Sequence, residues 1–351
     1  MILISICCDK KYKKIVPKGG IELKIKNILR IAAIILLSAS LCSCGNSDTL
    51  RMGTGNVGGH YYNYGNVLRE YAGDVLDVKR TAGSQANMRL LNEGFVDVAI
   101  VQSDVLSEAV NGTGDFSGEP VSDVRAVAGL YSEAFQLVVR SDSDIYELAD
   151  LKGKKMSVGE EGSGVAKNAE YLFRSAGVDI SDTETVYMSY AESAAALEKG
   201  DIDAFFLIVG APAAVVSELA ESTDVRFVAP DSTAIKYMTS LYKGYSQVIV
   251  PAGTYRGQNE DLVTVGVKAV LAADASASRE DIRELTAAIF ENSDKIKYSV
   301  TVSEPDPQFA VTDIPCSFHE GAAEYYQSIG ISVNTDPAAE SASFVFGAQD
   351  N

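Results

Sequence analysis

The chain has 351 residues and a mass of 37.4 kDa, which is enough for about two domains with sizeable cores. Its 46% hydrophobic and 22% charged residues, with a mean hydropathy of +0.04, exclude disordered and fibrous proteins. The 48 acidic residues outnumber the 30 basic ones and give a net charge of −18. This excludes a nucleic-acid partner, because binding to phosphates needs clustered cations.

Residues 24–44 have the pattern of an export signal. Three basic residues precede an apolar run over 31–37, which is too short to span a bilayer. Leu41 then stands three residues before Cys44, which resembles the lipobox of bacterial lipoproteins. We therefore expect Cys44 to carry the lipid and to become the first residue of the mature protein. An ordinary Cys in a discarded signal is the alternative.

Loss of the signal changes both the charge and the cysteine content. Residues 1–43 contain eight of the 30 basic and two of the 48 acidic residues, so their removal leaves a net charge of −24. Cys316 is then the only cysteine without a lipid. We expect no disulfide within the chain and a fold stabilised by its apolar core.

The segment before the signal suggests a later translation start. Lys18-Gly19-Gly20 can be encoded by a ribosome-binding sequence, and Leu23 can be encoded by TTG, an alternative start codon. We expect translation to begin at Leu23, and the DNA sequence of codons 18–23 tests this expectation.

From residue 49 onward, short apolar strands alternate with amphipathic helices, which is typical of an α/β fold. The first strand covers 49–52, and the helix after it has apolar residues at helical spacing from Tyr64 to Tyr71. A second strand covers 75–81. A later helix has apolar residues at near-helical spacing from Ile282 to Ile296.

A pattern that repeats at an offset of 106 residues predicts two similar lobes. Gly-rich segments begin the two copies at 53–55 and at 159–164. Hydroxyl residues before a helix follow at 83–84 and 189–190, and Gly-x-x-Asp precedes a buried strand at 94–97 and 200–203. Any two α/β units can share one such feature, but equal offsets at three landmarks favour a repeated topology. The helix N-termini of both lobes then form a cleft lined by backbone N–H donors, which suits a small anion.

Residues 53–58 also match Gly-x-Gly-x-x-Gly, the fingerprint of dinucleotide binding. A dinucleotide site needs an acidic residue at the end of the second strand, whereas this strand ends in Lys79 and Arg80. Export also removes the chain from the cofactor pool. We therefore predict no cofactor. The glycines let the backbone approach a ligand closely, or simply form a tight turn.

Patterns for catalysis and metal binding are scarce. His60 and His319 are the only histidines, and no Gly-x-Ser-x-Gly motif occurs, so we predict neither an enzyme nor a metal site. His60 precedes two tyrosines and either contacts a ligand or caps a helix. For Glu133, Glu160 and Glu161, a solvated loop face is favoured over an acid pair.

Several segments resemble, in order, the TAXI family of TRAP transporter solute receptors. They are 53–62, 81–87, 101–105, 159–164, 200–206, 249–255 and 319–326, within about residues 49–330. The resemblance implies a type II periplasmic-binding-protein fold, in which two lobes close on a small carboxylate. It also implies transfer of the ligand to a sodium-coupled TRAP membrane permease. An exported sensor module and a ligand-modifying enzyme on the same fold are the alternatives.

The resemblance and the helix starts give a set of candidate ligand-binding residues. They are Gly53, Thr54, Gly55, Tyr61, Tyr62, Ser84, Asn87, Gln102, Ser103, Asp104, Tyr131, Gly162, Ser163, Gly164 and Tyr190. We expect Ser84, Ser163 and nearby backbone N–H groups to hold the carboxylate, rather than Arg80 or Arg89. The family usually has small or neutral residues at 160–161, where this chain has two glutamates. We therefore do not assume that glutamate is the ligand, and an amino acid, a keto acid and a dicarboxylate remain the candidates.

The predicted organisation has three parts. Residues 1–43 form the leader and signal peptide, residues 47–132 with 256–351 form lobe one, and residues 133–255 form lobe two. We expect hinges in the strands near 131–139 and 248–266. The expected protein is a monomer, anchored by lipid to the outer face of the cell membrane, in the periplasm if the source is Gram-negative.

Overall fold

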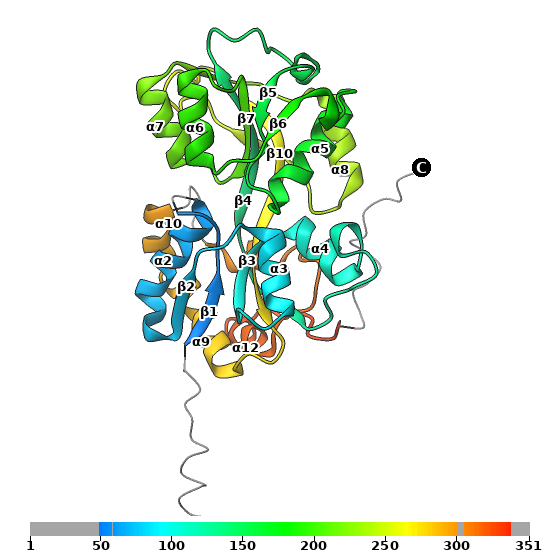
Figure 1. The fold of residues 1–351 in the computed structure, drawn as a ribbon. Helices are drawn as coiled ribbons and strands as arrows, with labels where there is room; N and C mark the ends of the chain where they lie inside the picture. The colour runs from blue at the N-terminus through cyan, green and yellow to red at the C-terminus, as the bar shows by residue number, and fades with distance from the viewer. Residues whose placement is uncertain (1–48, 58, 301–304, 338–351) are drawn as a thin grey trace, which may run out of the picture. The chain divides into compact units, whose positions relative to one another are not determined.

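The computed structural model describes residues 49–57, 59–300 and 305–337 (Figure 1). Leu23, Cys44 and the predicted signal lie outside these residues. Among the described residues, no helix has both the length and the apolar character needed to cross a bilayer.

One mixed sheet runs through the described chain and contains ten strands there. Its main order is β2-β1-β3-β10-β4-β7-β5-β6, with β8 beside β4 and β9 beside β10. The strands are β1 (Leu50–Gly53), β2 (Leu76–Lys79), β3 (Val98–Gln102), β4 (Val124–Arg140), β5 (Lys155–Ser157), β6 (Glu184–Val186), β7 (Ala204–Val209), β8 (Val225–Phe227), β9 (Ser246–Val250) and β10 (Leu262–Asp274).

The helices pack on the faces of this sheet. They are α2 (His60–Ala72), α3 (Ser84–Asn92), α4 (Ser103–Asn111), α5 (Gly164–Ser175), α6 (Tyr190–Lys199), α7 (Ala214–Ser222), α8 (Ser232–Leu241), α9 (Arg279–Glu291), α10 (Ser293–Val300), α11 (Pro307–Val311) and α12 (Glu320–Ser328). Short 3-10 helices occur at Gly73–Val75, Gly114–Phe116, Leu148–Leu151 and Ile180–Asp182.

Buried apolar side chains form separate cores in two halves of the sheet. One core contains residues from Leu50 to Tyr131 and from Ala269 to Tyr326. Two further cores, on opposite faces of β4 and β7, contain residues between Ala134 and Val267. We call residues 49–131 with 268–337 the first lobe and residues 132–267 the second lobe. The lobe boundaries given from the sequence, which place 256–267 in lobe one, stay a prediction.

Two long strands connect the lobes. The start of β4 pairs with β10, and its later residues 134–140 pair with β7 and β8 of the second lobe. In the reverse direction, the start of β10 pairs with β9, and residues 269–273 pair with β3 of the first lobe. Figure 1 shows β4 and β10 side by side between the two groups of helices.

The repeat predicted from sequence corresponds to equivalent elements in the two lobes. Helix α3 begins at Ser84 and α6 at Tyr190, and β3 begins at Val98 and β7 at Ala204, so both pairs keep the offset of 106. In each lobe the first strand lies between the second and the third, and all three are parallel. The predicted α/β fold with two similar lobes is confirmed.

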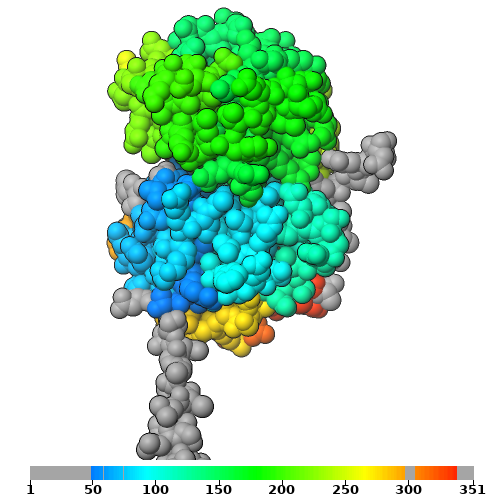
Figure 2. Space-filling model, in the orientation of Figure 1, coloured from blue at the N-terminus to red at the C-terminus, as the bar shows by residue number. Residues whose placement is uncertain are grey.

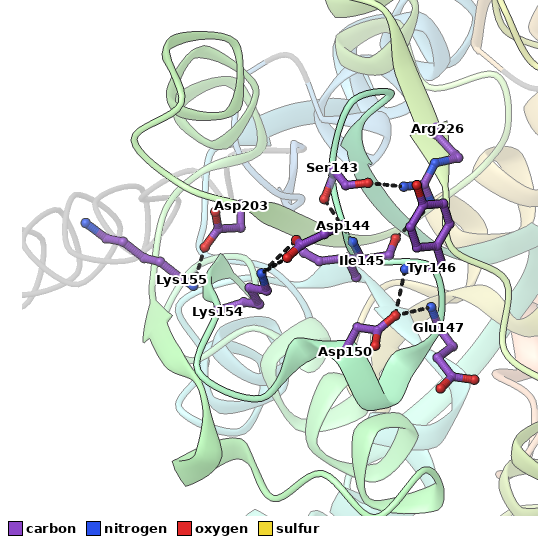
Figure 3. Close-up of polar contacts among 10 residues, drawn as sticks. All are labelled: Ser143, Asp144, Ile145, Tyr146, Glu147, Asp150, Lys154, Lys155, Asp203 and Arg226. Carbon is purple, nitrogen blue, oxygen red and sulfur yellow. Dashed lines mark hydrogen bonds and ion pairs between the residues drawn. The ribbon is translucent and has the colours of Figure 1, made fainter.

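The Asp of each Gly-x-x-Asp segment joins the third strand to the first. Asp97 accepts hydrogen bonds from the backbone N–H, Nε and Nη2 of Arg51, at 2.8, 2.8 and 2.6 Å. At the equivalent position, Asp203 Oδ2 accepts from the backbone N–H of Lys155 at 2.8 Å (Figure 3). The repeated acid is therefore explained by strand alignment.

The loop after β4 is fixed to β8 by a single arginine, as Figure 3 shows. Arg226 donates to the carbonyl oxygens of Ser143 and Ile145, and its guanidinium lies 4.5 Å from the ring centroid of Tyr146. These contacts attach the loop to the end of the second lobe where β4 ends.

We expect Asp97→Ala to lower the free energy of unfolding by about 1 to 2 kcal/mol at pH 7. Burial opposes the shift, but the hydrogen bonds and charge of Arg51 outweigh it and lower the pKa of Asp97. A depressed folded-state pKa gives stability that is present above the ordinary pKa of about 4 and is lost as the pH falls through the folded-state value. Urea unfolding at pH 7 and pH 3 measures this. Asp203→Ala, which removes one backbone bond, is the milder control, and an equal loss at both pH values would contradict the assignment.

One predicted helix is two helices in the structure. The segment with apolar residues from Ile282 to Ile296 breaks at Asn292, where α9 ends and α10 begins. Asn292 donates from Nδ2 to the carbonyl oxygen of Ala288 at 3.0 Å, and such a side-chain bond competes with helix continuation. Ile296 is nevertheless buried in the core of the first lobe.

Candidate functional site

A cavity of about 270 Å³ lies between the lobes. Figure 2 shows the second lobe (green) meeting the first lobe (blue and cyan) along a seam across the front face. The cavity is lined by Gly55, Asn56, Val57, Gly59, His60, Tyr61, Asn63, Ala82, Gly83, Ser84, Gln102, Glu133, Glu160, Ser163, Gly164, Val165, Met188, Ser189, Tyr190, Ala191, Ile208, Val209, Ala214, Val215 and Glu218. Its volume is just below the usual range for ligand pockets, so it suits a small molecule.

The first residues of five helices line this cavity: α2 and α3 from the first lobe, and α5, α6 and α7 from the second. At α6 the N-cap Ser189 accepts a hydrogen bond from the N–H of Glu192 at 3.3 Å, so its side chain caps its own helix. The N-cap of α5, Ser163, makes no such bond. Its side chain is only 7% exposed, and its Oγ has no partner among the described residues. Ser163 therefore presents an unused hydroxyl group at the cavity wall.

About half of the candidate residues line the cavity. Those in the lining are Gly55, Tyr61, Ser84, Gln102, Ser163, Gly164 and Tyr190. Those outside it are Gly53, Thr54, Tyr62, Asn87, Ser103, Asp104, Tyr131 and Gly162. The binding role of both groups stays a prediction.

Asn87 is an example of a candidate residue that lies outside the cavity lining. Its Nδ2 donates to the carbonyl oxygens of Thr54 and Ile100, both at 2.7 Å, so the side chain ties the loop after β1 to β3. Thr54 in turn donates from Oγ1 to the carbonyl oxygen of Lys79 at 2.7 Å. These polar side chains hold the strand ends in position.

Asp104 belongs to a hydrogen-bond network that joins the two lobes. Its Oδ2 accepts from Asn168 Nδ2 at 2.7 Å and from Tyr245 Oη at 2.8 Å, and both partners belong to the second lobe. One turn further along α4, buried Glu108 accepts from Lys167 Nζ at 2.5 Å. The α4–α5 contact thus lies directly behind the helix start that carries Ser163.

Glu133 corrects the expectation of a solvated loop. It lies within β4, is 2% exposed and accepts a hydrogen bond from Tyr61 Oη at 2.7 Å. Burial raises the pKa of Glu133 to about 8, and the hydrogen bond from Tyr61 opposes this shift. The signal that could have identified it is an isolated acid within the apolar run 124–139.

His60 brings an acceptor to the same part of the cavity. Burial lowers its pKa to about 4, opposed by a hydrogen bond to the backbone of Pro212, so the ring is neutral near pH 7. Its Nδ1 is buried without a partner among the described residues, as is Oε1 of Gln102. The ring of His60 packs edge-on against Tyr131, with centroids 6.0 Å apart.

The charges of the cavity are all acidic. Among the described lining residues there is no lysine or arginine, whereas Glu133, Glu160 and Glu218 are present. Arg80 lines an adjoining hollow together with Glu160, and Arg80 Nε donates to Asn56 Oδ1 at 2.9 Å. Any carboxylate in the cavity itself would therefore depend on neutral donors.

The sequence pattern of the NMT1-like family matches residues 52–330, which is most of the chain. This chain belongs to the NMT1-like family. Its structure is also similar to that of solved binding proteins. The periplasmic aliphatic sulphonate binding protein SsuA from Escherichia coli shares 17% identity, with a TM-score of 0.44, over 72% of this chain and 73% of that one. The corresponding values are 17%, 0.45, 72% and 98% for an ancestral arginine-binding protein bound to arginine.

No metal centre is apparent in the described part of this NMT1-like protein, which contains no group of three or more His, Cys, Asp or Glu residues arranged to hold an ion. His319 instead caps α12, where its Nδ1 accepts from the N–H of Gly321 at 3.1 Å. Cys316 is buried in the core of the first lobe.

Proposed function

We propose that this NMT1-like protein is an extracytoplasmic solute receptor that binds a small organic carboxylate in the cavity between its lobes. The single observation that carries the proposal is Ser163, a buried N-cap in the cavity lining whose hydroxyl group has no partner among the described residues. An amino acid, a keto acid and a dicarboxylate are the candidate ligands.

The helix starts supply the remaining donors. Unpaired N–H groups at the N-terminus of a helix attract an anion, and the helix dipole adds to this attraction. Helices α3, α5 and α6 each have nine residues or more and begin at the cavity. A carboxylate bound there accepts several charge-assisted hydrogen bonds and needs no arginine.

We further propose that the receptor is anchored through a lipid on Cys44, works as a monomer and passes its ligand to TRAP permease subunits. The lobes would move about hinges in β4 and β10, which are the strands that connect them. A neighbouring gene for a large permease with many membrane spans tests the transport role. Turnover of the bound ligand by the purified protein would instead favour an enzyme.

We expect Ser163→Ala to weaken carboxylate binding about 10- to 100-fold, because a hydrogen bond to a charged group contributes about 1.5 to 3 kcal/mol. A thermal-shift screen first identifies the ligand, since a ligand at 100 times its Kd adds about 2.7 kcal/mol of stability. Calorimetry on the variant then measures the loss.

The matched control is Arg89→Ala. Arg89 lies outside the cavity lining, with its guanidinium 5.7 Å from the ring centroid of Phe116, so its removal is expected to leave the affinity unchanged. A full loss of binding in Arg89→Ala, with unchanged affinity in Ser163→Ala, would overturn the neutral-donor mechanism.

A further inference from the structure

Glu133 differs from the other acids of the cavity in its burial. Glu160 is half-buried and Glu218 is exposed, whereas Glu133 is 2% exposed and lies on β4 between the lobes. Its neighbour Ser132 lines a hollow on the other face of the strand, because successive side chains alternate. Glu133 therefore faces the cavity from the strand that joins both lobes.

The groups around Glu133 come from five elements and include no cation. Tyr61 on α2 donates to it, and Gln102 at the end of β3 hydrogen-bonds to it. Tyr131 on β4, Tyr190 on α6 and Asp104 on α4 interact with it electrostatically. None of these groups carries a positive charge, so a carboxylate at this position lacks a counter-charge among them.

Two further acceptors lie in the same wall. His60 Nδ1 and Gln102 Oε1 are buried without partners among the described residues, and both side chains line the cavity. Buried polar atoms are normally paired, so a donor group of a ligand or a water molecule can pair with these atoms. The cavity thus has donors at its helix starts and acceptors around Glu133.

We propose that Glu133 receives the ammonium group of the ligand, and that the receptor therefore selects α-amino acids over keto acids and dicarboxylates. This inference rests on the proposed function, in which the helix starts hold the ligand's carboxylate. An α-amino acid carries both a carboxylate and an ammonium group, so it can pair with the donors at the helix starts and with the acceptors around Glu133. A keto acid leaves the acceptors unpaired, and a dicarboxylate places a second negative charge against an acidic wall.

Binding is coupled to the loss of a proton. Since the pKa of Glu133 is raised by burial to about 8, its carboxyl group holds a proton for about nine-tenths of the time at pH 7 in the empty site. The protonated carboxyl group and a ligand ammonium group give an ion pair, and the carboxyl proton leaves to solvent. An amino acid therefore releases close to one proton on binding at pH 7, and a keto acid releases none.

The test uses amino acids paired with the keto acids of the same carbon skeleton, with succinate and malate added. Calorimetry in phosphate and in Tris, whose ionisation enthalpies differ, counts the protons released. For the wild-type protein at pH 7, the best amino acid is expected to bind at least about 100-fold more tightly than its keto acid. Its affinity rises with pH between 6 and 8, about tenfold per unit at first, and then levels off.

Glu133→Gln is expected to abolish both the preference for the amino acid and the proton release. Glu284→Gln is the matched control, because it makes the same change at an exposed acid on α9 outside the cavity lining and is expected to keep both. If Glu133→Gln does not fold, the number of protons that the wild-type protein releases on binding still tests the proposal.

Tighter binding of the keto acid or the dicarboxylate, or amino-acid binding without proton release, would overturn the role of Glu133 and leave the receptor function standing. Failure of every compound in the panel to bind the wild-type protein would overturn the proposed function and this inference together.

Discussion

Asp104→Ala is expected to weaken ligand binding about 10- to 100-fold. The substitution leaves the Nδ2 of Asn168 without its acceptor, whereas the hydroxyl of Tyr245 can still donate to Oδ1 of Asn168. One buried donor left unpaired costs about 1 to 3 kcal/mol, which is about 10- to 100-fold in Kd. Because these bonds join the two lobes, their loss destabilises the arrangement of the lobes that encloses the cavity.

Calorimetry with the identified ligand measures the loss, and urea unfolding shows whether the lobes remain folded. Tyr245→Phe keeps the bond between Asp104 and Asn168, so it should lose only about threefold. Glu284→Ala, an exposed acid on α9, is the control for loss of negative charge. Binding by Asp104→Ala within about twofold of the wild-type affinity would show that the network does not support the bound arrangement.

Gly321→Ala is expected to lower the free energy of unfolding by about 3 kcal/mol. Gly321 is the second residue of α12, where this helix packs against α9 (Figure 1). A Cβ atom there would lie 2.2 Å from the carbonyl oxygen of Arg279 and 3.0 Å from the backbone nitrogen of Arg283. Both are backbone atoms of α9, so the helices have to separate to admit a methyl group.

Urea unfolding of the variant measures this effect. Gly55→Ala is the matched control, because the nearest atom to its added Cβ would lie 3.5 Å away, an ordinary contact distance. We expect that control to unfold within about 1 kcal/mol of the wild-type protein. Equal stability of the two variants would mean that the helices can adjust to the extra carbon.

The repeated topology could be predicted because it is encoded by short sequence patterns. Glycine marks the end of α6, where Gly200 has φ of 77°, and the strand that follows it is continuously apolar. These signals depend on a few neighbouring residues, so they survive in both copies at a constant offset. The helix starts at the cavity could be predicted for the same reason.

The sequence did not reveal which polar residues meet across the lobes. Asp104 and Tyr245 are 141 positions apart, and their contact depends on how two lobes pack. The burial of Glu133 depends on β10 and α2, which come from distant parts of the chain. Asn87 is a candidate through the resemblance over 81–87; its Nδ2 donates to the backbone of two strands, and its role in binding stays a prediction.

The placement of β10 has a consequence for the order in which the protein assembles. The buried residues of the second lobe form one continuous stretch, whereas those of the first lobe come from both sides of it. During synthesis the N-terminus emerges first, so the second lobe can fold before the first lobe has received residues 269–273 of β10. Until then β3 has an unpaired edge, which is a site for aggregation with other chains. Residues 49–131 of a chain that is still being made are therefore expected to expose this edge until β10 has been synthesised.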